Sequence, residues 1–161
     1  MTRQLWTLVG AVAIASVLDV LFVLKGTDLT AVVKYTMLTN MLAVLVLVPV
    51  HQWICVREGL IKPDFVANIR NGMKAGAPAA VLLGLATYLI IRFMAQGHIE
   101  SRMLELTEAL DASGITGDER TRRITSAQFI YSPVFHSTFV LLGCAITAFL
   151  SSVGSALMMR K

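Results

Sequence analysis

A run of predominantly apolar residues from Leu5 to Leu24, preceded by Arg3, constrains the fold more than any other feature of the chain. A helix rises 1.5 Å per residue, so about 20 apolar residues cross the ~30 Å hydrocarbon core of a bilayer. The apolar core of a cleavable signal sequence is shorter, ~7–15 residues, and ends at a small-residue cleavage site. This run is longer and no A-x-A site closes it. We therefore interpret it as a retained membrane span.

Three further apolar segments have the length of a span, at about 31–56, 75–94 and 129–159. The composition agrees, because only 15% of the residues are charged, against ~25% in soluble domains. The sequence thus predicts an all-α fold, a single membrane domain of four helices. Pro49 is expected to kink the second span, and Pro78 is placed in the first turn of the third, where proline is tolerated.

Residues 97–128 differ in kind from the spans. Their apolar positions recur at spacings of four, three and four, which indicates one face of an amphipathic helix: Ile99, Met103, Leu106 and Leu110. Acidic residues occupy the other faces: Glu100, Glu105, Glu108 and Asp111. Gly114 would end this helix, and the capping-box pattern from Thr116 to Glu119 would start a short basic one. We expect an amphipathic helical hairpin outside the membrane core, and a polar loop over residues 57–74.

Small residues recur at every fourth position in the third and fourth spans. The two ladders are Gly72, Gly76, Ala80 and Gly84, and Gly143, Thr147, Ser151 and Ser155. Helices in lipid pack through small faces that let their backbones approach closely. We expect the two ladders to face each other within the chain. The alternative is a seam between two copies in a homodimer.

Asp19 is the one acidic residue inside a predicted span. Ala11 and Ala15 precede it at four-residue spacing, so its side chain should point toward protein. An intramembrane carboxylate is costly and is a functional candidate by default. We expect it to pair with Lys34 near the start of the second span, with a role in proton or ion movement as the alternative.

The remaining polar candidates inside the spans are Asn40, Tyr88, His51 and His136, and the two histidines each lie near the end of a span. A lone histidine there is typically a hydrogen-bond partner between helices. Cys55 and Cys144 form no metal-ligand pattern with them, and no nucleophile, nucleotide or dinucleotide motif is found. The sequence therefore predicts no metal, no cofactor and no enzymatic activity, and a net charge of +4 is too small and dispersed to indicate nucleic acid.

Four spans place both termini on one side of the membrane. The 14 lysines and arginines divide equally between the two sides, but those on the terminal side lie in shorter segments. Since the positive-inside rule is counted over short loops, we expect cytoplasmic termini and an external hairpin. Trp6, Trp53 and Tyr131 fall where interfacial aromatic residues are expected.

A family resemblance rests mainly on three stretches of the last third of the chain: 103–105, 112–116 and 129–133. They read Met-Leu-Glu, Ala-Ser-Gly-Ile-Thr and Phe-Ile-Tyr-Ser-Pro, and a glycine-containing span with a short basic tail follows. This layout resembles the four-span bacterial membrane proteins grouped as domain of unknown function 4199. The resemblance covers most of the chain in layout and residues from about 99 onward in detail. It implies a multi-pass protein of the bacterial cytoplasmic membrane, and it transfers no residue roles because the group has no assigned activity.

The leading interpretation is a small non-enzymatic membrane protein: a scaffold, accessory or assembly subunit. Its partners would be the lipid bilayer and either another membrane protein or further copies of itself. The alternative is a small ion or solute transporter, or a channel-like oligomer, in which Asp19 and Lys34 line the path. An intramembrane enzyme is the least favoured reading, because no nucleophile and base can be named.

Overall fold

The computed structural model describes residues 2–26, 28–60 and 64–159. They form helices only, which are α1 Thr2–Lys25, α2 Leu29–Arg57, α3 Phe65–Met94, α4 Gln96–Ala112, α5 Gly117–Ile130 and α6 Pro133–Met158. Four of these helices, α1, α2, α3 and α6, are long and apolar enough to cross a membrane. The prediction of an all-α protein with four candidate spans is thus confirmed.

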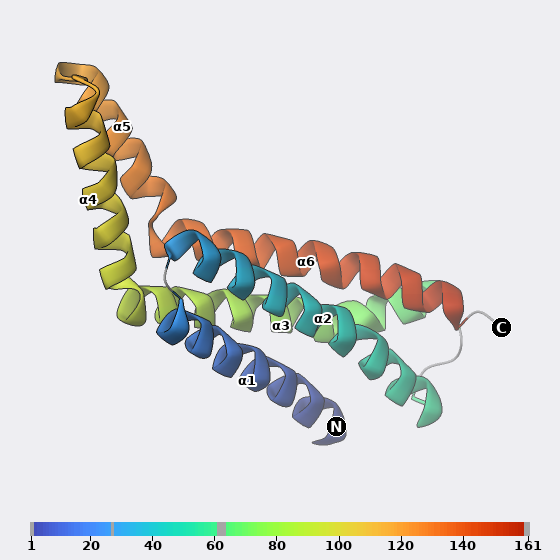
Figure 1. Cartoon of the computed structure of the whole chain (residues 1–161). Coiled ribbons are helices and arrows are strands. Elements are labelled where there is room, and N and C mark those ends of the chain that lie inside the picture. The colour runs from blue at the N-terminus through green and yellow to red at the C-terminus, as the bar shows by residue number, and fades with distance from the viewer. Residues whose placement is uncertain (1, 27, 61–63, 160–161) are drawn as a thin grey trace.

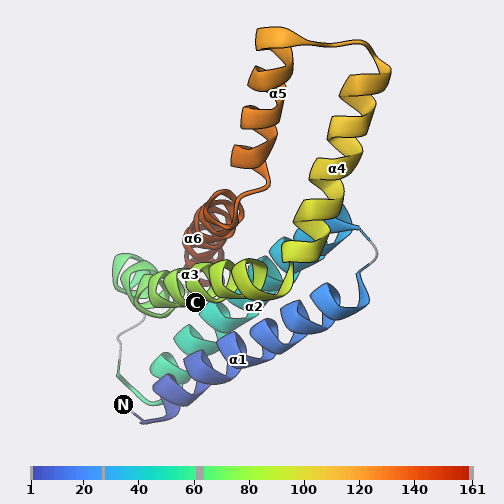
Figure 2. The same ribbon diagram turned by 90° about the vertical axis from the view of Figure 1, so that its left-hand side faces the viewer.

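The four long helices run side by side in alternating directions (Figure 1). α1 begins and α6 ends at the same end of this group of helices, which we call the terminal end. α4 and α5 leave from the opposite end and lie steeply across the direction of the spans (Figure 2). They pack against each other and reach beyond the four long helices.

The third helix is longer than predicted. It begins at Phe65 rather than at 75, and the Asp64 side chain caps it by accepting a hydrogen bond of 2.9 Å from the Ala67 amide. The polar loop predicted over 57–74 is therefore wrong for its second half, and Pro78 lies in the helix interior rather than in its first turn. Charged Arg70 and Lys74 suggested a loop, but both lie on the exposed side of the helix.

The last span is shorter than predicted, because α6 begins at Pro133 and not at 129. Ser132 is the N-cap and accepts a hydrogen bond of 3.2 Å from the Phe135 amide. Proline is preorganised for the first helical position and needs no donor there. Phe129 therefore stays in α5, where its ring lies 5.3 Å from that of Phe135.

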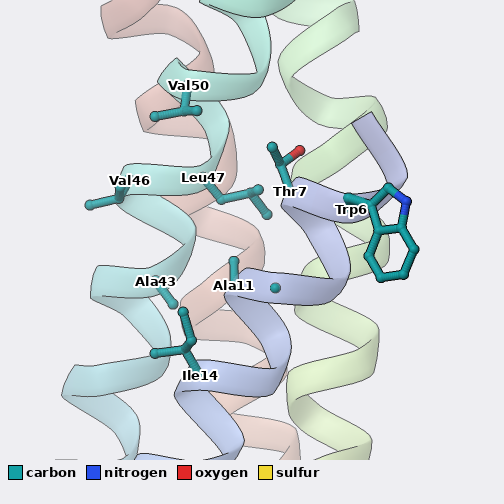
Figure 3. Close-up of a pocket in the computed structure, with 9 residues that line it drawn as sticks. Trp6, Thr7, Ala11, Ile14, Ala43, Val46, Leu47 and Val50 are labelled. Carbon is teal, nitrogen blue, oxygen red and sulfur yellow. The ribbon is translucent and has the colours of Figure 1, made fainter. Parts of the chain in front are cut away.

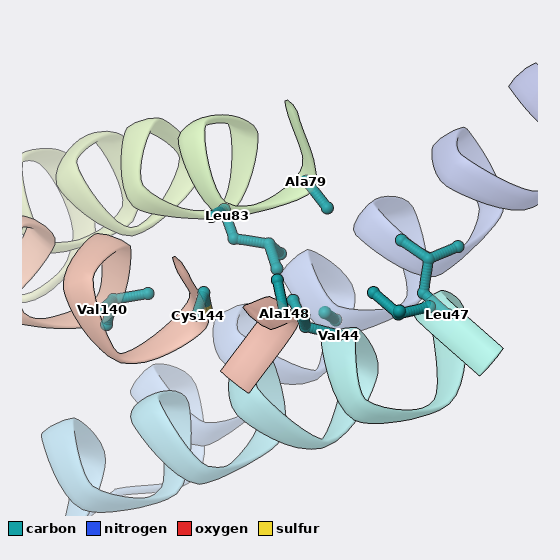
Figure 4. Packing of buried hydrophobic residues seen from close by; sticks show 10 residues of the cluster. Val44, Leu47, Ala79, Leu83, Val140, Cys144 and Ala148 are labelled. Carbon is teal, nitrogen blue, oxygen red and sulfur yellow. The ribbon is translucent and has the colours of Figure 1, made fainter. Parts of the chain in front are cut away.

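The apolar core lies among the four long helices at mid-height. Its fully buried members come from α1, α2, α3 and α6, and they include Ala15, Val44, Leu47, Val48, Ala79, Ala80, Leu83, Val140, Cys144 and Ala148 (Figure 4). Half of these ten side chains are small, four alanines and one cysteine. In lipid such residues favour association by allowing close van der Waals contact between helices.

The α3 ladder faces α6, as predicted. A Cβ added at Gly76 would lie 2.5 Å from the Cβ of Ala148, and one added at Gly84 would lie 3.0 Å from the Cβ of Leu141. The side chains of Ser152 and Gln52 lie against Gly72 in the same way. These glycines let the two helices approach more closely than alanine would allow.

The α6 ladder does not face α3, so that half of the prediction is wrong. Met37 and Met41 of α2 are the nearest side chains to Gly143, and Ser151 donates a 3.3 Å hydrogen bond to the Leu45 carbonyl of α2. The hydroxyls of Thr147 and Ser155 bond to carbonyls one turn earlier in α6 itself. The helix bears small residues on two faces, and the face that meets α3 is the one with Ala148 and Ser152.

The helix predicted around 99–110 is present as α4. Its four periodic apolar residues are half-buried or buried, and its four acidic residues are exposed. α4 ends before Gly114, which has φ +69° as the sequence predicted for a C-terminal stop. α5 starts after Thr116, but the Thr116 side chain makes no capping bond. A φ of +66° at Gly117 departs from the helical value that the capping box needs there.

Candidate functional site

A buried polar group joins three of the candidate spans. Asp19 of α1, Asn40 of α2 and Thr87 of α3 are each at most 1% exposed. Asn40 Nδ2 donates a 2.8 Å hydrogen bond to Asp19 Oδ2 and lies 3.4 Å from Thr87 Oγ1. The prediction that the face with Ala11 and Ala15 turns Asp19 toward protein agrees with this geometry, since Ala15 is also buried.

Several oxygens of this polar group remain without a hydrogen-bond partner among the described residues. They are Asp19 Oδ1, Asn40 Oδ1 and the hydroxyl of Thr36, which lies one turn before Asn40. A buried polar atom without a protein partner is costly, and in a native protein it indicates strain, a bound water or ion, or a functional role. This group is therefore the candidate site of the chain.

Lys34 does not belong to this site. Its side chain is exposed, whereas Asp19 is fully buried and takes its hydrogen bond from Asn40. The predicted Asp19–Lys34 pair is wrong for a geometric reason. Residues 34 and 40 lie six positions apart, so they project from different faces of α2.

A second polar group lies nearer the terminal end, and sequence reasoning missed it. Gln52 is fully buried, and its Nε2 donates a 2.6 Å hydrogen bond to the Asn68 carbonyl of α3 and a longer one of 3.4 Å to the Ser152 carbonyl of α6. The available signal was a second side-chain amide inside one apolar helix, twelve positions after Asn40. Gln52 links three helices at the level where Gly72 brings α3 close to α6.

The apolar core separates the two polar groups. Between Asn40 and Gln52, the buried apolar residues of α2 are Val44, Leu47 and Val48, and Leu83 of α3 belongs to the same core cluster. The described side chains thus form two polar layers with an apolar layer between them. This arrangement ties helices together at two levels.

The two predicted histidines lie at opposite ends of the long helices. His51, near the terminal end, has its Nε2 3.7 Å from the sulfur of Cys55, and the ring of His136 lies 6.0 Å from that of Phe135 at the other end. The structure therefore does not bring the histidines together or join them to Asp19. Within residues 2–26, 28–60 and 64–159, no group of three His, Cys, Asp or Glu side chains could hold a metal ion.

The exterior of α4 and α5 is a charged surface, separate from the buried polar groups. Three ion pairs form there, Arg102–Glu105 at 2.5 Å, Arg120–Asp111 at 3.1 Å and Arg123–Glu119 at 2.7 Å. The hydrogen bond that Arg102 donates to the Glu105 carboxylate raises the pKa of the guanidinium above its usual range. These pairs are exposed, so they contribute little stability, and they leave other charges of the surface open to solvent.

Comparison with known proteins adds no relative to this description. No family model matches the chain, and neither a curated protein nor a solved structure matches it.

Proposed function

We propose that this protein is a small, non-enzymatic accessory or assembly subunit of the bacterial cytoplasmic membrane, and that α4 and α5 form its docking arm. The observation that carries the proposal is the position of these helices. They lie steeply across the long helices and extend past them, so that most of their surface is free of contact with the rest of the chain (Figure 2).

The composition of the arm fits a partner outside the hydrocarbon core. Glu100, Glu108 and Arg122 are exposed and form no ion pair with another described residue. Charged groups of this kind steer association and select a partner by complementarity. Leu104 is 61% exposed beside them and would supply an apolar contact.

We propose further that the termini are cytoplasmic and the arm external, as the positive-inside rule favours. The resemblance to domain of unknown function 4199 supports the bacterial setting through the order of spans, amphipathic helix, glycine turn and Ser-Pro entry. The orientation can be tested by adding a protease site or a cysteine label to the loop between α4 and α5 and measuring its accessibility in intact cells.

A photo-crosslinking experiment tests the docking arm. A crosslinking residue is placed at Glu108 on the arm and, as a matched control, at Phe149 on the lipid-facing side of α6, where the side chain is 52% exposed. We expect one reproducible protein adduct from the arm position and none from the control. In a second variant a short Gly/Ser linker replaces residues 96–131. An adduct pattern that is the same at both positions, or normal partner co-purification without the arm, would refute the proposal.

A second candidate function is a small ion or solute transporter, and the specific observation in its favour is the burial of Asp19 with one oxygen unpartnered. Intramembrane carboxylates commonly mark ion or proton paths. The apolar layer of Val44 and Leu83 counts against it. The test is ion and proton flux in proteoliposomes, compared between the parent protein and Asp19→Asn. A flux lost in that variant, with assembly intact, would replace the accessory function by transport.

A further inference from the structure

An apolar groove lies on the outer surface of the molecule, between α1 and α2. It has a volume of about 410 Å³, within the ~300–1,000 Å³ typical of ligand sites. Its walls are almost wholly apolar, with Ile14 and Ala11 on the α1 side and Val46 and Val50 on the α2 side (Figure 3).

Gly10 explains why the groove is open. It lines the groove, and a Cβ added there would meet no atom within 4 Å. By contrast, side chains of α6 occupy the space beside Gly76 and Gly84 on α3. The small residue on α1 thus leaves empty space rather than a helix contact.

One wall of the groove continues along α2 to a positively charged side chain, Arg57. Val46, Val50, Trp53 and Arg57 follow one another at spacings of four, three and four, which places them on one face of the helix. The guanidinium carbon of Arg57 lies 5.1 Å from the centroid of the Trp53 ring. Trp6 lies at the same end of the groove on α1 and is 72% exposed.

Arg57 therefore lies about 10 Å beyond Val50 along the helix axis, at the terminal end where the bilayer interface is expected. Tryptophans are typical of that interface, and a nearby arginine attracts anionic lipid headgroups. An apolar groove that ends in an interfacial cation matches an amphiphile with an acyl chain and a phosphate.

We propose that this groove is a binding site for an anionic phospholipid. One acyl chain would lie between α1 and α2 against Gly10, and the phosphate would contact the Arg57 guanidinium. The charge at the end of the groove favours this occupant over a helix of a second copy, which would fill the apolar space but leave Arg57 without an anion. Glu58 also borders the headgroup end, so the charge preference must be measured directly.

The test uses the full chain in detergent, exchanged with an equimolar mixture of phosphatidylglycerol and phosphatidylcholine, with bound lipids counted by native mass spectrometry. About 1 kcal/mol for one interfacial arginine predicts an approximately five-fold preference for phosphatidylglycerol. Arg57→Gln should remove this preference. Arg70→Gln, which removes an exposed arginine of α3 near the same end, should retain it.

The groove itself is tested with a pair of glycine variants. Gly10→Leu should reduce the retention of both lipids by filling the groove. Gly154→Leu is the matched control, because a Cβ at Gly154 also meets nothing within 4 Å but this residue does not line the groove. Equal retention of the two lipids by the parent protein would overturn the proposal. So would an equal loss in Arg57→Gln and Arg70→Gln, or a dimer that Gly10→Leu converts to a monomer without change in lipid binding.

Discussion

Asn40 donates a hydrogen bond of 2.8 Å to Asp19, and this bond joins α1 to α2 in the interior of the protein. The two side chains lie 21 positions apart in the sequence and are both fully buried. Because apolar faces give helices little preference for one another over lipid, a buried polar bond of this kind specifies which face of α1 turns inward.

The first prediction concerns this pair. Asp19→Ala and Asn40→Ala should each lower the free energy of unfolding by about 1–3 kcal/mol, since each leaves a buried partner unsatisfied. The double variant should cost less than the sum of the two, with a coupling of about 0.6–1.7 kcal/mol. The free energy of unfolding is measured by titrating the protein in mixed micelles with SDS.

Thr30→Ala is the control for this cycle, because Thr30 is an exposed hydroxyl residue on the same helix as Asn40. It should leave the unfolding midpoint unchanged. Costs of Asp19→Ala and Asn40→Ala that add without coupling would show that the two side chains do not interact in the membrane protein.

The second prediction ranks the glycines by the space around them. Among Gly76, Gly84 and Gly143, alanine at Gly76, whose Cβ would lie 2.5 Å from that of Ala148, should destabilise the protein most. Alanine at Gly84 should cost less, because the nearest atom lies at 3.0 Å. At Gly143 only flexible methionine atoms lie nearby, at 3.4 Å and beyond, so the cost there should be small.

Gly154→Ala provides the control for this series. Its Cβ would meet nothing, so replacing a helical glycine should leave the stability unchanged or raise it by about 0.5–1 kcal/mol. Thermal unfolding in detergent gives the order. If Gly76→Ala melted at or above the temperature of Gly154→Ala, α3 and α6 would not pack as described.

The sequence predicted the helical class, the four apolar spans and the inward direction of Asp19, because these depend on length and on periodicity along one helix. It did not predict the partner of Asp19. Lys34 and Asn40 both lie along the part of α2 that is near Asp19. The choice between them therefore depends on how α2 is rotated about its axis. That rotation is set by the packing of α2 against α3 and α6. The sequence of α2 alone does not specify this packing.

The same limit explains two further errors. α6 carries small residues on two faces, and spacing alone did not show that Ala148 rather than Thr147 would meet α3. The start of α3 was missed because Arg70 and Lys74 interrupt the apolar pattern, although both can lie on the outer side of a helix whose inner side holds Asn68 and Gly72. Long basic side chains at a span end can reach the interface without breaking the helix.

The third prediction concerns Gln52, whose amide donates to the Asn68 carbonyl at 2.6 Å. Gln52→Leu removes the donor but keeps an uncharged side chain, and we expect a cost of about 1 kcal/mol. Gln52→Glu places a carboxylate among backbone carbonyls that repel it, so it should cost clearly more than leucine does. Equal unfolding midpoints for the two variants would show that this position is reached by water.

The fourth prediction concerns the ion pair between Arg120 and Asp111, at 3.1 Å across the two helices of the arm. Both side chains are partly exposed, so Arg120→Gln should change the stability by no more than about 1 kcal/mol, and less at high salt. Exchanging the two charges, with Asp111→Arg and Arg120→Asp together, should restore the parent value. A large loss in Arg120→Gln that salt does not change would show that the arginine is buried against another surface.

The last prediction concerns the turn that ends α4. The Gly114 amide donates to the Asp111 carbonyl at 3.1 Å and the Ile115 amide to the Leu110 carbonyl at 3.2 Å, the two bonds of a Schellman motif. This motif needs a left-handed residue, and Gly114 has φ +69°. Gly114→Ala should therefore destabilise the arm by about 1–2 kcal/mol.

Gly97→Ala is the matched control, because Gly97 lies within α4 with open space around it, and alanine there should stabilise the helix. Hydrogen exchange of residues 96–130 is the measurement. We expect faster exchange in Gly114→Ala, confined to these residues, and slower exchange in Gly97→Ala. If both variants left the exchange unchanged, α4 would not end in this turn. If Gly114→Ala accelerated exchange in the four long helices as well, the arm would be part of their cooperative unit rather than a separate docking element.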